Sequence, residues 1–131
     1  MRREVGVGRS SSVQRVLVVD DDPGVLDILQ IALQAEGYEV MLARNGLEAL
    51  DRAGEQLPHL MLVDLMMPIM DGWELVRQCR GRNGLAAVPI IILSAARGIE
   101  RERATLGVEA ALAKPFDLIR LLTEVSAWAS A

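Results

Sequence analysis

Carboxylate, hydroxyl and ammonium side chains follow the hydrophobic runs of this sequence, each at the point where a run ends. The first run leads into three aspartates, and later runs lead into Asp64, Ser94 and Lys114. A carboxylate can attack phosphorus, while a metal ion, a hydroxyl and an ammonium share the negative charge of the phosphoryl oxygens. We therefore predict that Asp64 is a nucleophile that accepts a phosphoryl group.

The aspartates after the first run predict a metal site. Several carboxylates in one cleft repel one another unless a cation neutralises them. Oxygen ligands suit Mg²⁺, Mn²⁺ or Ca²⁺, and the sequence has no cluster of histidine and cysteine that favours zinc. Asp22 has another task, because Asp22-Pro23 is typical of a helix N-cap and first helical residue.

The elements that must position these residues alternate between strand and helix five times. Hydrophobic runs predict strands at 15–19, 38–42, 60–64, 89–94 and 110–113. Amphipathic stripes predict helices at 23–36, 45–53, 71–80 and 116–129, and one of undefined start that closes near Gly107. This order is typical of an α/β fold with a five-stranded parallel sheet, whose ligand site lies beyond the carboxyl ends of the strands.

Length and composition fit one domain. Of the 131 residues 51% are hydrophobic, so we expect a packed core at 14–131 after a flexible tail at 1–13. The net charge is −4 and the basic residues are scattered, which argues against direct nucleic-acid binding. No run is long enough to span a membrane, no signal peptide is present, and the single cysteine suits a reducing compartment, so we expect the cytoplasm.

Four motifs at the strand ends resemble those of response-regulator receiver domains. They are Val18-Val19-Asp20-Asp21-Asp22, the segment from Leu62 through Asp64 to Asp71-Gly72, Leu93-Ser94-Ala95, and Ala113-Lys114-Pro115-Phe116. The resemblance covers about residues 14 to 130. It implies a flavodoxin-like (βα)5 doubly wound sandwich and a role in phosphorelay signalling.

The resemblance also implies a role for each residue at the phosphorylation site. Asp64 would be the phospho-acceptor, loaded by a histidine kinase, a phosphotransfer protein or a small phosphodonor. Ser94 would contact the phosphoryl group and move inward, and Lys114 would pair with a phosphoryl oxygen. The Lys114–Pro115 peptide bond is typically cis in this family.

For the metal, the resemblance implies four contributors around one Mg²⁺ ion. Asp21 would bind the ion directly, together with Asp64, and Asp20 would bind it at least through water. Met66 would supply its backbone carbonyl, so that its side-chain type does not matter for this role.

The sequence departs from the receiver pattern on the output side. Ala111 stands three residues before Lys114, where receivers usually carry Tyr or Phe as part of the switch. We therefore predict that phosphorylation is read through the packing of the helix after the fourth strand, or near the site itself. Met66 and Ala96 flank the expected water path and offer no hydrogen bond to an attacking water, so we predict slow self-hydrolysis of the acyl phosphate.

Other functions remain open at this point. Asp20-Asp21-Asp22 also resembles the nucleophile motif of haloacid-dehalogenase phosphatases, although Gly24 stands where that family carries Thr or Val and a cap domain has no room. A pseudo-receiver that only binds partners is a third reading. As a receiver, the protein would be no enzyme beyond its part in its own phosphorylation and dephosphorylation. We expect a monomer or weak dimer that binds an unknown downstream protein. It would be a stand-alone receiver, with a relay carrier or a receiver cut from a longer chain as alternatives.

Overall fold

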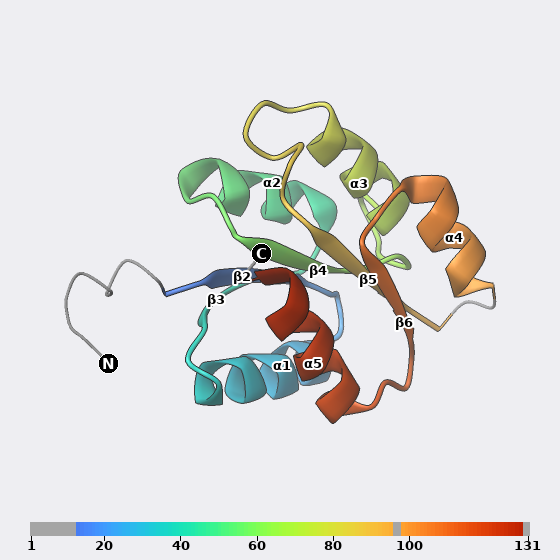
Figure 1. Ribbon diagram of the computed structural model, residues 1–131. Coiled ribbons are helices and arrows are strands. Elements are labelled where there is room, and N and C mark those ends of the chain that lie inside the picture. The colour runs from blue at the N-terminus through green and yellow to red at the C-terminus, as the bar shows by residue number, and fades with distance from the viewer. Residues whose placement is uncertain (1–12, 96–97, 130–131) are drawn as a thin grey trace.

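Five parallel strands form one sheet between two layers of helices in the computed structural model, which describes residues 13–95 and 98–129 (Figure 1). The strands lie in the spatial order β3-β2-β4-β5-β6. They are β2 (Arg15–Val19), β3 (Glu39–Ala43), β4 (Leu60–Asp64), β5 (Ile90–Ser94) and β6 (Ala110–Ala113). The predicted flavodoxin-like α/β fold is thus confirmed.

The helices divide between the two faces of the sheet. In Figure 1, α1 (Pro23–Ala35) and α5 (Leu118–Ala129) cover one face, and the other three cover the opposite face. Those three are α2 (Gly46–Glu55), α3 (Gly72–Arg80) and α4 (Ile99–Leu106). Every residue of β4 and β5 is buried, as expected for parallel strands covered on both faces.

Alternate residues of each strand supply two separate cores. Leu17 and Val19 belong to the cluster under α2, α3 and α4, whereas Val16 and Val18 belong to the cluster under α1 and α5. Aromatic residues are few, so aliphatic side chains build both clusters. The sheet is therefore a rigid platform whose carboxyl ends all point to one side.

Most helix boundaries follow the capping signals in the sequence. The Asp22 carboxylate accepts a hydrogen bond from the Gly24 N–H at 2.9 Å, and Pro23 is the first residue of α1. Gly37 follows the end of α1 with a left-handed φ of 94°, as its predicted stop position requires. α5 begins at Leu118 instead of Phe116, because the Asp117 carboxylate accepts hydrogen bonds from the next turn and acts as its cap.

A close backbone contact fixes the start of α3 against the end of β4. The Gly72 N–H donates to the Leu65 carbonyl at 3.0 Å, and a β-carbon at Gly72 would lie 2.6 Å from the Leu65 Cα atom. Only glycine fits such an approach. α3 is therefore attached directly to the segment that follows Asp64.

Two further sequence predictions concern the N-terminal tail and membrane-spanning helices. Residues 1–12 of the predicted tail lie outside the described residues. Among the helices that the structure describes, none combines the length and the hydropathy that crossing a bilayer requires.

Candidate functional site

The carboxyl ends of β2, β4, β5 and β6 bring the predicted site residues together. Asp20 directly follows β2, Asp64 and Ser94 are the last residues of β4 and β5, and Lys114 directly follows β6. Carboxylate oxygens of Asp20, Asp21 and Asp64 all lie within 4.8 Å of one another. Residues up to 94 positions apart in sequence thus lie close together because four parallel strands end at the same edge of the sheet.

Lys114 joins the acidic cluster to the neighbouring strand end. Its Nζ atom lies 2.6 Å from Asp20 Oδ2 and 3.6 Å from Asp64 Oδ2. Its backbone N–H donates to the Ser94 carbonyl at 2.9 Å, which places it beside the end of β5. The Lys114–Pro115 peptide bond is cis, as the resemblance implies.

Burial makes the charges at this site costly. Asp20 and Ser94 are fully buried and Asp64 is only 4% exposed, while Asp21 is exposed. Burial, and next the charge of Asp20, raise the pKa of Asp64 to about 6, although Lys114 and the Met66 N–H oppose the shift. For Lys114, burial lowers the pKa, but the hydrogen bond and the charge of Asp20 outweigh it, so the pKa is raised overall.

The donor set fits a hard divalent cation. One ammonium faces three carboxylates, so the pocket has an excess of negative charge that a divalent ion would neutralise. Asp20 already uses both oxygens, one on Lys114 and one on the Asp22 N–H at 2.9 Å. Asp21 is exposed, and within the described part of the chain no hydrogen bond to its carboxylate is recorded. Both Asp20 oxygens are thus engaged by other residues of the site, whereas the Asp21 carboxylate lies in the open.

The engagement of Asp20 also bears on the phosphatase alternative. A haloacid-dehalogenase enzyme would need Asp20 as its nucleophile, but this carboxylate is fully buried and bonded to Lys114. Asp64 carries the weaker contact with the ammonium, at 3.6 Å. Lys114 thus holds Asp20 more closely than it holds Asp64.

The loop after β4 lies directly beside the predicted acceptor. The Met66 N–H donates to Asp64 Oδ1 at 3.3 Å, and the Met66 side chain is 59% exposed. This contact holds the Met66 backbone at the site, and the metal contact of its carbonyl stays a prediction. Ala96, the other residue of the expected water path, lies outside the described residues.

The output side has no aromatic ring at β6 and a weakly packed helix above it. Ala111 is 6% exposed and contributes only a methyl group to the cluster under α2, α3 and α4. α4 has no buried residue, and its first residue follows Gly98, which offers no side-chain cap.

One link between α3 and α4 was not predicted. The Trp73 indole N–H donates to the Glu102 carboxylate, and Trp73 packs against the same cluster as Ala111. No motif marks this pair in the sequence, because the two residues are 29 positions apart and meet only through the fold.

Comparisons with known proteins agree with this geometry. A family model described as "Response regulator receiver domain" matches residues 16–126. "Response regulator MprA" of Mycobacterium tuberculosis is 41% identical over 115 residues, which are 86% of this chain and 49% of that protein. The chain thus spans about half the length of the curated relatives that it matches.

Solved structures have the same fold along almost their whole length. A putative response regulator from Chloroflexus aurantiacus has a TM-score of 0.84 at 32% identity, over 91% of this chain and 99% of that one. The receiver domain of a sensor histidine kinase from Pseudomonas aeruginosa has a TM-score of 0.82 at 30% identity, over 91% and 99% of the two chains. The latter structure holds a magnesium ion coordinated in the active-site cleft.

Proposed function

The chain belongs to the response regulator receiver domain family of phosphorelay signalling, and on this premise we propose that Asp64 accepts the phosphoryl group. The observation that carries the assignment is the position of the Asp64 carboxylate. It is almost fully buried, its neighbours Asp20 and Asp21 lie within 4.8 Å, and the Lys114 ammonium is 3.6 Å away. The contacts of the two Asp64 oxygens are long, at 3.3 and 3.6 Å, whereas both oxygens of Asp20 have contacts of 2.9 Å or less and Asp21 is exposed.

The reaction we propose is an in-line displacement at phosphorus. An ionised Asp64 oxygen forms a bond to phosphorus while the P–N bond of a phosphohistidine breaks, and the imidazole leaves with the electron pair. The product is an acyl phosphate on Asp64. Lys114 and Ser94 stand at the neighbouring strand ends, where an ammonium and a hydroxyl stabilise the transferred oxygens.

Mg²⁺ is the cofactor that we propose for this site, with Mn²⁺ as a substitute. Asp20, Asp21, Asp64 and the Met66 carbonyl would hold it. When bound, the ion neutralises charge on the phosphoryl oxygens and keeps Asp64 ionised at neutral pH. Apart from the ion, the buried environment itself keeps competing water away from the carboxylate.

Labelling with acetyl phosphate tests the assignment directly. The protein incubated with acetyl phosphate and Mg²⁺ should gain one phosphoryl mass increment, and Asp64→Asn should not. Asp22→Asn is the matched control, because Asp22 only caps α1 through its contact with Gly24. An increment that persists in Asp64→Asn, or that is lost in Asp22→Asn with the fold intact, would contradict the proposal.

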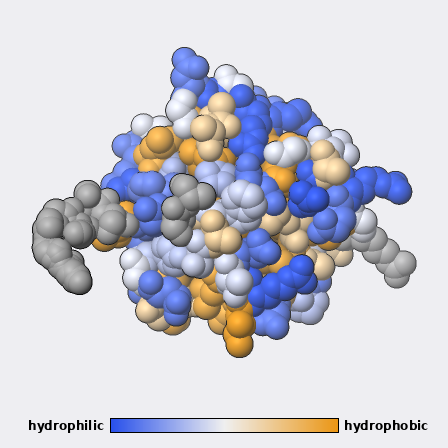
Figure 2. Space-filling model, in the orientation of Figure 1, coloured by the Kyte–Doolittle hydropathy of each residue, from blue (hydrophilic) through white to orange (hydrophobic). Residues whose placement is uncertain are grey.

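The donor is proposed to be a histidine kinase or a phosphotransfer protein that docks on α1 and α5. Three of the exposed large hydrophobic side chains, Ile28, Ile31 and Ile119, belong to these helices. In Figure 2, hydrophobic areas reach the surface along the lower edge of the view, where α1 and α5 lie. Ile31→Asp should slow transfer from a protein donor and leave labelling by acetyl phosphate unchanged; equal loss with both donors would contradict the docking site.

The output is proposed to pass through α4 instead of a ring on β6. Ala111 offers no ring that could turn, and no residue of α4 is fully buried, so α4 is the element that we expect to shift when Ser94 moves. Beryllofluoride should therefore change the chemical shifts of α4 amides more than those of α3 amides. An unchanged α4 in the beryllofluoride complex would contradict this output route.

The phosphorylated form is proposed to be long-lived. Met66 lies beside Asp64 and has no side-chain group that could orient a water molecule. The protein would then act on no substrate other than its own acyl phosphate. We propose that it works in the cytoplasm and that its output is a change in partner binding. A lifetime of seconds for the acyl phosphate would contradict the prediction.

A further inference from the structure

The most exposed methionine of the described residues lies beside the proposed phospho-acceptor. Met66 is 59% exposed, and its backbone N–H donates to Asp64 Oδ1 at 3.3 Å. The neighbouring Leu65 is held on two sides, because its N–H donates to the Leu93 carbonyl at 3.2 Å and its carbonyl accepts from the Gly72 N–H at 3.0 Å. The Met66 side chain is unbranched and flexible, and it starts from a backbone that is fixed at the site.

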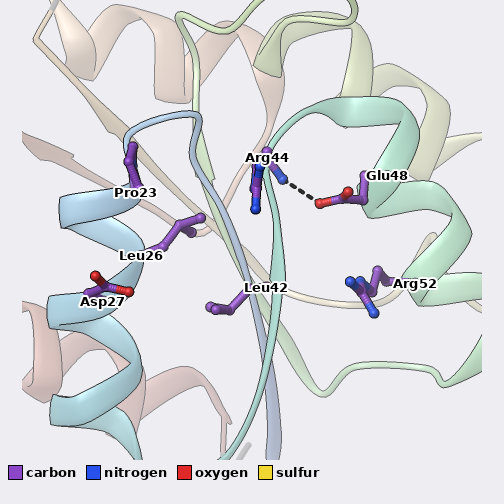
Figure 3. A pocket seen from close by; sticks show the side chains of 7 residues that line it. All are labelled: Pro23, Leu26, Asp27, Leu42, Arg44, Glu48 and Arg52. Carbon is purple, nitrogen blue, oxygen red and sulfur yellow. Dashed lines mark hydrogen bonds between the residues drawn. The ribbon is translucent and has the colours of Figure 1, made fainter.

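The other methionines within the described residues are better protected. Met61 is 1% exposed and Met67 9% exposed, and both belong to the core cluster under α2, α3 and α4. Met41 and Met70 are half-buried and pack against the same cluster. The cavity between α1 and α2 that Figure 3 shows is lined by charged and aliphatic side chains, and its described lining residues carry no sulfur atom. A small oxidant in solution therefore meets Met66 first.

The single cysteine does not compete for such an oxidant. Cys79 is fully buried, and burial raises the pKa of its thiol to about 11. Almost none of the reactive thiolate is then present at neutral pH. Methionine reacts as a neutral thioether, so that access to its sulfur atom decides how fast it is oxidised.

We propose that Met66 is an oxidation site that controls the lifetime of the phosphorylated form, an inference that rests on the function proposed for Asp64. The oxidant is hydrogen peroxide. The sulfur lone pair attacks one peroxide oxygen, and an S–O bond forms while the O–O bond breaks. The leaving hydroxide takes up the proton of the transferred oxygen and departs as water. Sulfur is oxidised to the sulfoxide, and the peroxide is reduced.

A sulfoxide at Met66 supplies the polar group that the thioether lacks. The thioether sulfur is only a weak hydrogen-bond acceptor, whereas oxidation makes the side chain polar. Beside the acyl phosphate, the sulfoxide oxygen accepts a hydrogen bond from a water molecule and orients it for attack. The water oxygen forms a bond to phosphorus while the bond from phosphorus to the Asp64 oxygen breaks. Inorganic phosphate leaves, a proton passes to the solvent, and the carboxylate is restored.

Peptide mass mapping tests the order of oxidation. The full chain treated with hydrogen peroxide should gain one oxygen atom at Met66 before any gain at the half-buried Met41 and Met70. The buried Met61 and Met67 should react last. Oxidation of Met66 no faster than that of the half-buried methionines would overturn the proposal. This measurement requires no phosphorylation and is therefore independent of the role of Asp64.

The decay of the acyl phosphate tests the consequence of oxidation. Protein labelled with acetyl phosphate and Mg²⁺ and then freed of the donor should lose its label about twofold to tenfold faster after oxidation, the acceleration that one hydrogen bond is worth. In Met66→Leu, peroxide should not change the decay rate. The control Met67→Leu, in the same loop, should respond to peroxide as the wild type does. Met66→Gln, which carries an amide oxygen, should lose its label quickly without peroxide.

Reversal and failure of the effect complete the test. Methionine sulfoxide reductases for both epimers, with a thiol reductant, should restore the slow decay. An unchanged decay rate in the oxidised wild type, or a peroxide response that persists in Met66→Leu, would overturn the proposal. An oxidised protein that takes up no label would also overturn it, because the sulfoxide would then block phosphoryl transfer. If the untreated wild type took up no label on Asp64, the proposed function itself would be contradicted.

Discussion

The strand ends around Asp64 and the helix α4, which follows β5 in the chain, are built in opposite ways. Asp20 and Ser94 are fully buried, and Asp64 almost so, at the ends of strands whose side chains are buried on both faces. α4 has no buried residue. The part that would perform the chemistry is held in place, whereas the part that would report it is held loosely. Such a division suits a switch, because local stability is lowest where movement is required.

Removal of the Lys114 ammonium should have the largest effect on stability, because it acts on the rigid strand ends around Asp64. Lys114→Met leaves the buried Asp20 carboxylate without its cation, which should cost about 3–5 kcal/mol of the free energy of unfolding at neutral pH without Mg²⁺. Urea unfolding measures the loss. The control Arg77→Met removes an exposed ion pair with Glu74 and should leave the free energy of unfolding almost unchanged. Similar small losses in both would mean that the site is not held by its buried charges.

Asp64→Asn should have an effect of opposite sign. Asp64 has a pKa of about 6 in the folded protein, against 3.8 for an ordinary aspartate, so ionisation above pH 6 destabilises the fold by about 3 kcal/mol. Without metal, the wild-type free energy of unfolding should therefore fall between about pH 4 and pH 6 relative to that of the variant. The difference should vanish below pH 4 and shrink when Mg²⁺ is added. If the wild type were as stable as the variant at pH 7.5 in the presence of a metal chelator, the ionised Asp64 carboxylate would not destabilise the fold.

Gly72→Ala tests the close backbone contact between the start of α3 and the segment that follows Asp64. The added methyl group would press on the Leu65 backbone, which should cost about 1–3 kcal/mol as overpacking. Gly54→Ala in α2 is the matched control, because a β-carbon there meets nothing within 4 Å and should stabilise by up to about 1 kcal/mol through helix propensity. Thermal unfolding of the two variants should thus shift in opposite directions.

Glu102→Ala should have the smallest effect on global stability. It removes the acceptor of the Trp73 indole and should cost about 1 kcal/mol or less. Hydrogen exchange should accelerate in α4 while that of β4 and β5 stays unchanged. Glu100→Ala, which removes an exposed contact with Arg103 on the same helix, is the control and should leave the exchange of α4 nearly unaltered. Uniform acceleration across the sheet would show that α4 is not a separate, weakly held unit.

The sequence predicted the strands and the strand ends around Asp64 far better than it predicted α4 and its contacts. Buried parallel strands need unbroken hydrophobic runs, so runs such as Leu60–Val63 predict the strand, and the polar residue that ends each run marks the site. The start of α4 had no such signal, because Gly98 precedes it and no α4 residue is fully buried, although Ile99 and Leu106 pack against the core. The Trp73–Glu102 hydrogen bond depends on the distance between α3 and α4, which no local sequence pattern encodes. The tight approach at Gly72 likewise depends on where two backbones meet.

The two tryptophans report on different halves of the molecule. Trp73 packs in the layer of α2, α3 and α4, and Trp128 packs in the layer of α1 and α5. Each indole N–H donates to a glutamate of its own layer, Glu102 or Glu124. Replacing either tryptophan by phenylalanine would leave a single intrinsic fluorophore. The protein thus carries a separate optical probe on each side of its sheet, and events on the two sides can be timed against each other without an added dye.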